Sequence, residues 1–477
     1  MCALKLVPPE GLYKQSPWSS EASLSTITAV ENTYSTLSPL THAAKERELR
    51  NPLDIVWAKT DELDDNGQEP FSTFKYKINQ LVVELFPSLE ASAQLMIEEV
   101  GSGAFNRVIG VSILPSKKHR DSALSFAYSF YKLLRTSTPQ DYVVRLPLDG
   151  RDQLSGLISD MTRDVAILQV VSSRLTIPVP KVISYELNEN NALQRPYVLQ
   201  NRLRGQSLRI LMRTLNTQQM VSAVEQITKI IEKIAAVTAP AAGFISIQNL
   251  EFPSASHIHI RQYPVPTDQL AARFPGFNQV DEQLASPQTP FEYLVDHCQR
   301  WHRYEESIDH HENKALWTQL VAIGRSLSRR GWLGDRFHLV HDDLYPRNIL
   351  AIVTSPTTVE VTGIVDWDMS FFAPKFVAFR PPYWAWMGSH SSERDEDNAI
   401  EEPEYEEGIL LKNTFKLVAS EEFVGFALSP EGVLARKLFY ILEGGMLTKG
   451  RRILATELVR QWDYLYPTDK LCQFNAV

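Results

Sequence analysis

The sequence predicts an α+β protein in which β-rich segments come first and long helices follow. β-like runs lie at 98–109, around a pair of glycines, and at 141–147. The clearest helix is predicted over 217–236, where apolar residues recur every three or four positions before a proline. A second long helix is predicted over 314–330. With 477 residues, the chain has ample material for two lobes.

The remaining elements follow from composition and periodicity. Residues up to about Pro52 are rich in Ser and Thr without a sustained period, so we expect a loosely ordered extension. Helices are predicted between Phe74 and Leu89 and from Asp164 onward, the second ending at the prolines of 178–180. Between about Gly243 and Asn313, many Pro, Gln and His residues predict irregular structure.

The most informative stretch is Val340–Leu350. Asp343 lies five residues before Asn348, between two apolar β-like runs, and Asp366 follows the next such run at 359–365. Phosphoryl transfer requires groups that position a hydroxyl and hold Mg²⁺. Asp343 suits the first task as base or orienter, while Asn348 and Asp366 offer the oxygen ligands that magnesium favours. The alternative is that both aspartates are ordinary turn carboxylates.

Two motifs here resemble those of the aminoglycoside phosphotransferase and choline kinase-like superfamily: His341-x-Asp343-Leu344-x-x-x-Asn348 and Ile364-Val365-Asp366-Trp367. The resemblance implies a bilobal protein-kinase-like fold, with a small β-rich N-lobe and a larger, mainly helical C-lobe. It also implies ATP and Mg²⁺ as cofactors and a small-molecule hydroxyl as the phosphate acceptor. The implied regions are an extension over 1–73, a nucleotide-binding N-lobe over 74–204 and a catalytic C-lobe over 205–477.

The resemblance also implies a nucleotide site upstream. Glu98–Ile109 looks like a glycine-rich phosphate loop, whose glycines let the backbone approach phosphates, and 195–205 resembles the strand and hinge that bind adenine. The implied nucleotide-binding residues are Gly101, Ser102, Gly103, Asn106, Val108, Arg145, Asp164, Gln200 and Arg202.

Two positions depart from the protein-kinase pattern. Arg145 replaces the usual lysine and Asp164 the usual glutamate of an ion pair, and Arg is not equivalent to Lys because its planar fork prefers two-point contacts. Fungal-type members of the superfamily resemble this chain in having Arg in a Tyr-Val-x-Arg-x-Pro run, which favours a subfamily trait. The alternative is a catalytically silent module that binds a nucleotide or metabolite.

A protein kinase is a weaker alternative. Trp367 follows the metal aspartate where a protein kinase has Phe-Gly, and Ala373-Pro374-Lys375 lacks the glutamate that ends an activation segment. The acceptor remains open among aminoglycosides, amino alcohols, sugars and specialised metabolites. Asp368, Tyr345 and Trp384 are candidate acceptor contacts, with core packing as the alternative for Trp384. Asp342 is expected to point toward solvent or a neighbouring amide.

Composition excludes several other classes. A net charge of −9 without a compensating basic stripe argues against nucleic-acid binding, and no apolar run approaches the ~20 residues of a membrane helix. The start of the chain lacks a secretory pattern, and Cys2, Cys298 and Cys472 lie far apart, so a reducing cytoplasm is the expected location. The acidic run from 393 to 407 could attract a cationic acceptor, although such runs are usually solvated. No oligomeric state is predicted.

Overall fold

The computed structural model describes residues 69–87, 89, 94–102, 106–114, 140–148, 154–251, 257–267, 283–387, 395–469 and 471. The chain forms two compact units, one comprising residues up to Ile158 together with Ser184–Gln200, the other Ser159–Ile183 together with Asn201–Val477. Most of the predicted N-terminal extension lies outside the described residues, as do Cys2 and Cys472. The lobe boundaries expected from the sequence stay predictions.

The first unit contains a helix and most of a five-stranded sheet with the strand order β1-β2-β3-β5-β4. Its elements are α1 (Phe71–Leu85), β1 (Gln94–Ser102), β2 (Asn106–Leu114), β3 (Gln140–Pro147), β4 (Val182–Glu186) and β5 (Tyr197–Asn201), with β4 and β5 crossing the division between the units. Phe74, Ile78 and Leu81 of α1 share one apolar cluster with alternate residues of β2 and β3. Helix α1 ends before Phe86, because Phe86 precedes Pro87 and a residue before proline disfavours helical backbone angles.

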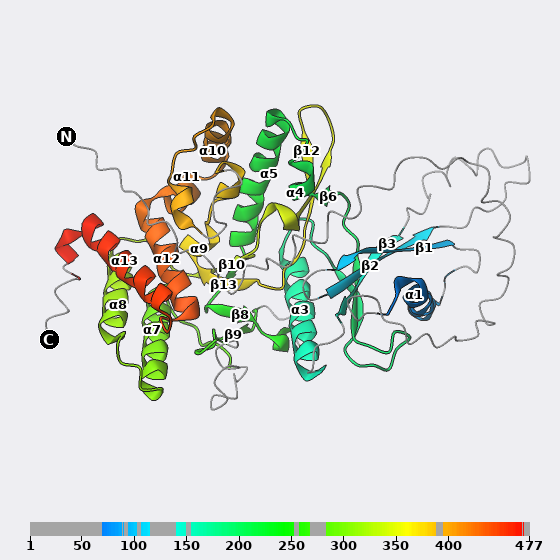
Figure 1. Ribbon diagram of the computed structural model, residues 1–477, viewed down its shortest axis with the longest axis horizontal. Coiled ribbons are helices and arrows are strands. Elements are labelled where there is room, and N and C mark those ends of the chain that lie inside the picture. The colour runs from blue at the N-terminus through cyan, green and yellow to red at the C-terminus, as the bar shows by residue number, and fades with distance from the viewer. Residues whose placement is uncertain are drawn as a thin grey trace, which may run out of the picture. The chain divides into compact units, whose positions relative to one another are not determined.

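The second unit is mainly helical (Figure 1). Its helices are α3 (Leu154–Arg174), α4 (Leu208–Leu211), α5 (Thr217–Ala235), α7 (Pro290–Ser307), α8 (Lys314–Arg329), α9 (Lys375–Ala378), α10 (Glu406–Val418), α11 (Glu421–Leu428), α12 (Pro430–Gly444) and α13 (Lys449–Leu465). Its strands are β6 (Gln206–Ser207), β7 (Thr238–Ala239), β8 (Gly243–Ile245), β9 (Ile260–Arg261), β10 (Phe337–Val340), β11 (Ile349–Val353), β12 (Val359–Ile364) and β13 (Phe371–Pro374). Short 3₁₀ turns lie at Ile247–Leu250, Pro346–Asn348, Tyr383–Ala385, Glu396–Ala399 and Pro467–Asp469. The predicted α+β class, β-rich at first and helical later, is confirmed.

Helix α5 forms where its apolar period predicts it. Asn216 accepts a hydrogen bond from the backbone of Gln219, whose side chain accepts one from the Asn216 backbone, and this capping box satisfies two otherwise unpaired N–H groups. Val224, Ile227 and Ile231 are buried along one face. The prediction of this helix is confirmed, and so is that of α8.

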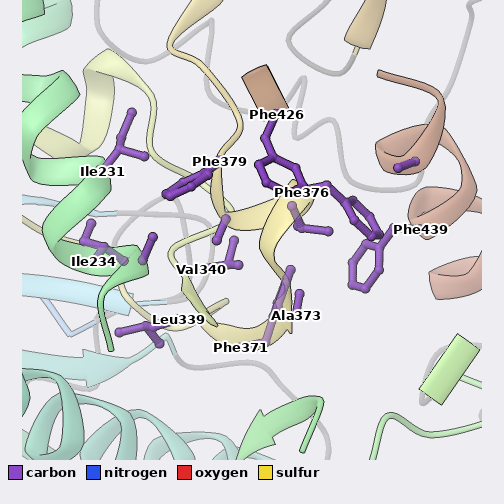
Figure 2. Packing of buried hydrophobic residues seen from close by; sticks show 14 of the residues in the cluster. Ile231, Ile234, Leu339, Val340, Phe371, Ala373, Phe376, Phe379, Phe426 and Phe439 are labelled. Carbon is purple, nitrogen blue, oxygen red and sulfur yellow. The ribbon is translucent and has the colours of Figure 1, made fainter. Parts of the chain in front are cut away.

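One apolar core positions the segment that follows β10. Figure 2 shows Ile231 and Ile234 of α5 and Leu339 and Val340 of β10 in the same cluster as the rings of β13, α9, α11 and α12. The labelled aromatic residues are Phe371, Phe376, Phe379, Phe426 and Phe439. β10 pairs with β13 in antiparallel register, with Val340 opposite Phe371. The apolar core therefore holds the end of β10 at Val340, and this fixes the position at which the following segment begins.

Two element predictions were wrong in extent. Helix α3 begins at Leu154, ten residues before Asp164, and its buried residues Ile167, Leu168 and Val171 join the core of the second unit. The predicted start was late although Leu154, Leu157, Ile158 and Met161 already have the helical period, so the sequence contained the signal for the earlier start.

The stretch 243–313 is also more regular than predicted, because it contains α7. Thr289 caps this helix and Pro290 occupies its first turn, where the missing proline N–H costs nothing. Its buried face includes Tyr293, His297 and Trp301, so the polar and aromatic composition that suggested a loop belongs to a packed helix. Among the described residues, no helix combines the length and apolar character needed to span a membrane.

Candidate functional site

The segment His341–Asn348 connects β10 to β11 and is held by a buried histidine. The His341 Nε2 atom donates to the carbonyl of Val365 at 3.0 Å, and its ring lies 4.5 Å from the Trp367 ring, centroid to centroid. Burial lowers the pKa of His341 below its ordinary value, so the ring is neutral near pH 7. These contacts hold the turn in place, and Asp343 remains the candidate base.

Asp343 lies at the centre of a local hydrogen-bond network. Arg347 donates through Nε at 3.2 Å to Oδ2 and through Nη2 to Oδ1, so the guanidinium contacts both carboxylate oxygens. The Asn348 Nδ2 atom donates to the same Oδ2 at 2.6 Å and to the Asp343 carbonyl at 2.9 Å. The carboxylate is therefore fixed in orientation by its own loop.

The strand pair β11 and β12 brings the second acidic motif to this loop. Ile349 lies opposite Ile364, and the Val365 N–H donates to the Asn348 carbonyl at 2.9 Å. Asp366 follows directly, exposed and with a positive φ of 66°. Trp367 is fully buried and donates to the Ile364 carbonyl, which fixes the turn. The structure thus brings Asp343, Asn348 and Asp366 together, as their sequence order predicted.

The oxygen atoms at this point suit a hard cation. Since the Asn348 amide nitrogen is turned to Asp343, its Oδ1 is the atom that a metal would use, and the exposed Asp366 carboxylate follows one residue after Val365. Mg²⁺ is usually held by one or two such protein ligands together with substrate phosphates. Within the described part of the chain, no cluster of three or more His, Cys, Asp or Glu side chains has metal-binding geometry. The amide oxygen of Asn348 and the carboxylate of Asp366 are of the type that Mg²⁺ favours.

Asp342, expected to point toward solvent or a neighbouring amide, lies beside a cavity. It is half-buried with a positive φ of 57° and lines a cavity of about 70 Å³ in the second unit. The charges of Glu396 and, to a smaller extent, Asp342 raise the pKa of Arg380, which lines the same cavity. An acidic and a basic side chain from different segments thus lie around one cavity.

That cavity explains the candidate acceptor contacts. Its walls are apolar residues of α5, β10 and α9, together with Leu344, Tyr345 and Trp384. The Trp384 indole donates to the Leu344 carbonyl at 3.1 Å. Tyr345 is buried, and the guanidinium groups of Arg347 and Arg380 lie 4.8 and 5.8 Å from its ring centroid. Both aromatic residues thus line a space beside the loop, while the half-buried Asp368 is absent from the lining.

The predicted nucleotide-binding residues are only partly described. Gly101 and Ser102 end β1 and Asn106 begins β2, so the glycine-rich segment is a hairpin, whose Gly103 lies outside the described residues. Val108 pairs directly with Arg145 of β3, and both are half-buried. Because directly paired residues project to the same face, these two side chains share the face opposite the cluster formed by Ile109 and Val144.

The other predicted nucleotide contacts are divided between the two units. Gln200 is buried at the end of β5 in the first unit, and Arg202 is half-buried at the start of the second. Asp164 is half-buried on α3 and belongs to the second unit, whereas Arg145 belongs to the first. The Arg145–Asp164 ion pair stays a prediction.

Sequence reasoning missed three residues that shape the site. Arg347 lies at position i+4 relative to Asp343, a spacing at which opposite charges often pair. This spacing was the available signal for their ion pair. Ser207 donates to the carbonyls of Pro346 and Arg347 at 3.1 and 3.2 Å, which anchors the 3₁₀ turn before Asn348. Arg380 gave no such signal for an ion pair, because its carboxylate partner Glu396 is distant in sequence.

Part of the acidic run that could have attracted a cation is used within the fold. Glu396 forms a buried ion pair with Arg380 at 2.8 Å and another with Arg436, and these cations hold its pKa below the usual range against the effect of burial. Asp397 pairs with Lys437 and Glu402 with Lys412. The remaining glutamates of the run that the structure describes, at 401, 404, 406 and 407, are exposed.

The model of the Phosphotransferase enzyme family matches residues 122–375. Two curated relatives carry the name "Altered inheritance of mitochondria protein 9, mitochondrial". The protein from Lodderomyces elongisporus is 31% identical over 133 residues, which cover 28% of this chain and 18% of the relative. That from Debaryomyces hansenii is 29% identical over 100 residues, 21% of this chain and 16% of the relative. The matched stretch thus spans less than a fifth of either relative.

Solved structures similar to this chain include aminoglycoside phosphotransferases. One, a complex with GDP and kanamycin, has 15% sequence identity and a TM-score of 0.36, covering 82% of this chain and 98% of its own. Another, a thermostable mutant in a ternary complex with ADP and hygromycin B, has 12% identity and a TM-score of 0.39, covering 83% and 98%.

Proposed function

We propose that this chain, which belongs to the phosphotransferase enzyme family, transfers the terminal phosphate of ATP to a hydroxyl group of a small molecule. Family membership supports phosphotransfer. The finer assignment depends on one observation: the Val365 N–H···O=C Asn348 hydrogen bond places Asp366 beside the loop that carries Asp343. A carboxylate for the acceptor and oxygen ligands for a cation are thereby held within one short region of the second unit.

Asp343 is the proposed base or orienter. Its contacts with Arg347 and Asn348 fix the direction of its oxygen atoms, so that an acceptor hydroxyl is oriented on arrival. Asn348 Oδ1 and Asp366 would hold Mg²⁺, which when bound neutralises phosphate charge. His341 and Trp367 act indirectly by keeping the two motifs in register.

The first unit is the proposed source of the phosphate and adenine contacts. The β1–β2 hairpin carries Gly101 and Asn106 near its turn, and the face with Val108 and Arg145 offers an apolar side chain beside a cation. Nucleotides are bound in similar solved structures, GDP in one and ADP in another. ATP is the donor that we propose.

The decisive experiment is removal of the Asp343 carboxylate. Asp343→Ala and Asp343→Asn should lower phosphate transfer to an acceptor panel about 10²–10⁴-fold, because a positioned base or orienter contributes roughly this much. ADP release and product mass would be measured together with the free energy of unfolding. Asp309→Asn is the matched control, since this side chain is 97% exposed and far from the loop in sequence. Unchanged turnover in Asp343→Ala would refute the assignment.

The second candidate is a silent nucleotide- or metabolite-binding module. The replacement of the usual lysine and glutamate by Arg145 and Asp164 motivates it, as does the occupation of both Asp343 oxygens by Arg347. Nucleotide binding without Mg²⁺-dependent ATP consumption, across an acceptor panel, would favour this module over the enzyme.

A cytoplasmic location is also proposed, on the basis of the widely separated cysteines and the buried, unpaired Cys298. The two curated relatives are named as mitochondrial proteins, so fractionation of cells that express the tagged full chain provides the test. Co-sedimentation with mitochondria would overturn the cytoplasmic assignment.

A further inference from the structure

We propose that the acceptor carries an anionic group next to its reactive hydroxyl and that Arg347 recognises this group. The inference rests on the proposed function and names the chemical class of its acceptor: a hydroxy acid or another alcohol with a nearby carboxylate or phosphate. Its basis is the balance of charge around Asp343 in the second unit.

Arg347 places a positive charge at the reaction centre. Its guanidinium contacts both Asp343 oxygens, yet 36% of its side chain remains exposed. The ring of the buried Tyr345 lies 4.8 Å from the guanidinium carbon and supports it from one side. An acceptor hydroxyl that reaches Asp343 must therefore approach a partly exposed, preoriented arginine.

The carboxylate proposed to face the acceptor hydroxyl is already compensated by an arginine. Asp343 is paired with Arg347, whereas Asp342 lines the same cavity as Arg380, whose ion-pair partner is Glu396. Asp366 is assigned to the metal. A polyamine or aminoglycoside requires several carboxylates that do not pair with a cation of the protein, and Asp343 is not one of them.

Three carboxylates of the acidic run downstream already have a partner within the fold. Glu396, Asp397 and Glu402 already pair with cations of the fold. A cationic acceptor would therefore meet Arg347 without compensating attraction from these carboxylates, whereas an anionic acceptor gains a charge-assisted contact.

The geometry of arginine fits this task. A guanidinium has five N–H donors in a planar fork that matches carboxylate and phosphate groups. Two hydrogen bonds from Arg347 now go to Asp343. When an anionic acceptor binds, its hydroxyl takes a place on Asp343 and its anionic oxygens accept from Arg347, so one residue pair recognises both ends of the molecule.

The test measures binding separately from transfer. Glycolate, glycolamide and ethanolamine form a matched set of anionic, neutral and cationic hydroxyl compounds, and next-longer homologues of each extend the set. They are titrated by calorimetry into the full chain with Mg²⁺ and AMP-PNP. We expect the hydroxy acids to bind at least about tenfold more tightly than the other two classes, in line with a charge-assisted hydrogen bond.

Variants separate recognition from a structural role. Arg347→Gln should bring the acid-to-amide affinity ratio to about one, and Arg347→Lys should keep part of the preference. Arg460→Gln, at an exposed arginine paired with Glu457, is the matched control and should leave the ratio unchanged. An Arg347 that only holds Asp343 would alter turnover with every acceptor but not this ratio.

The outcomes distinguish this inference from the proposed function. Equal binding of the three classes, failure of every hydroxy acid to bind, or a preserved ratio in Arg347→Gln would overturn it. Rapid transfer to a cationic or neutral acceptor would confirm the kinase and refute the acceptor class. Selective binding of anions without transfer to any hydroxy acid would support anion recognition by Arg347 and refute the kinase.

Discussion

At the scale of single residues, the loop after β10 depends on side chains that each fix another group. The amide nitrogen of Asn348 donates to Asp343 and orients that carboxylate. The amide oxygen of Asn348 therefore points away from the carboxylate. His341 connects the same loop to Val365, one residue before Asp366. The proposed chemistry therefore needs correct orientation of a few polar groups more than any unusual pKa.

Asp366→Ala tests the proposed metal ligand. Loss of this carboxylate should weaken binding of Mg²⁺ with AMP-PNP by at least about tenfold, since one charged ligand of the cation disappears. Calorimetry with and without EDTA would measure it. The metal-free nucleotide should bind both proteins alike, and an unchanged affinity in the presence of Mg²⁺ would contradict the assignment. Glu360→Ala, at an exposed carboxylate of β12, is the control.

His297 gives a prediction for the pH dependence of stability. Burial and the nearby Arg300 lower its pKa from 6.5 to about 3, while its Nε2 donates to the Leu442 carbonyl. Below about pH 6.5, His297 binds a proton in the unfolded chain but stays neutral in the folded chain. The free energy of unfolding should therefore fall as pH drops from 6.5 towards 3.

His297→Gln should remove this contribution, reducing the slope by about 1.4 kcal/mol per pH unit between pH 4 and 5.5. Chemical denaturation across this range would measure it. His311→Gln, at an exposed histidine, provides the control. An identical slope in wild type and His297→Gln would contradict a neutral, buried ring.

At the scale of elements, a buried ion network connects the segment after α9 to α12. Glu396 contacts both Arg380 and Arg436, and Arg436 also donates to the carbonyls of Phe426 and Ala427. Since Arg380 also lines the same cavity as Asp342, this network extends to the loop that carries Asp343. The position of the loop thus depends on helices much later in the chain.

Glu396→Gln should destabilise the protein by about 3 kcal/mol, because it leaves the buried guanidinium of Arg436 and the half-buried one of Arg380 without their carboxylate. Urea denaturation would measure the change. Glu457→Gln, which breaks a largely exposed pair with Arg460, should have a much smaller effect. Comparable losses in the two variants would show that the buried network does not have the predicted role.

At the scale of the whole molecule, each compact unit carries its own group of predicted site residues. The first contributes the β1–β2 hairpin and the Val108–Arg145 face, the second the loop with Asp343 and Asp366. Ligand binding to the native state stabilises it by mass action. The stability of the full chain therefore reports on nucleotide binding without requiring an acceptor.

Mg²⁺ with AMP-PNP at about 100 times its dissociation constant should raise the free energy of unfolding by roughly 2.7 kcal/mol. Chelation with EDTA should remove most of this gain in the wild type. Asp343→Asn should retain it, because this residue is assigned to the acceptor rather than the metal. Absence of any stabilisation at saturating nucleotide would count against both candidate functions.

Much of the fold and of the site could be predicted because their signals are local. The period of apolar residues predicted α5 and α8, and the spacing of Asp343, Asn348 and Asp366 predicted a shared site on adjacent turns. The helix α7 was missed because its polar and aromatic residues hide the apolar face that packing reveals. Local pattern identifies an element only when one face is clearly apolar.

The sequence by itself determined the order of the motifs, the chemistry of the loop His341–Asn348 and the α+β class. Tertiary structure decided which charges meet: Arg347 with Asp343, Asp342 with Arg380, and Arg380 with Glu396. The reason is that residue type and spacing fix what a group can do, whereas the net charge at a site depends on side-chain direction and on partners from distant segments. The partly exposed Arg347 beside Asp343 is the reason to propose an anionic acceptor rather than a polyamine.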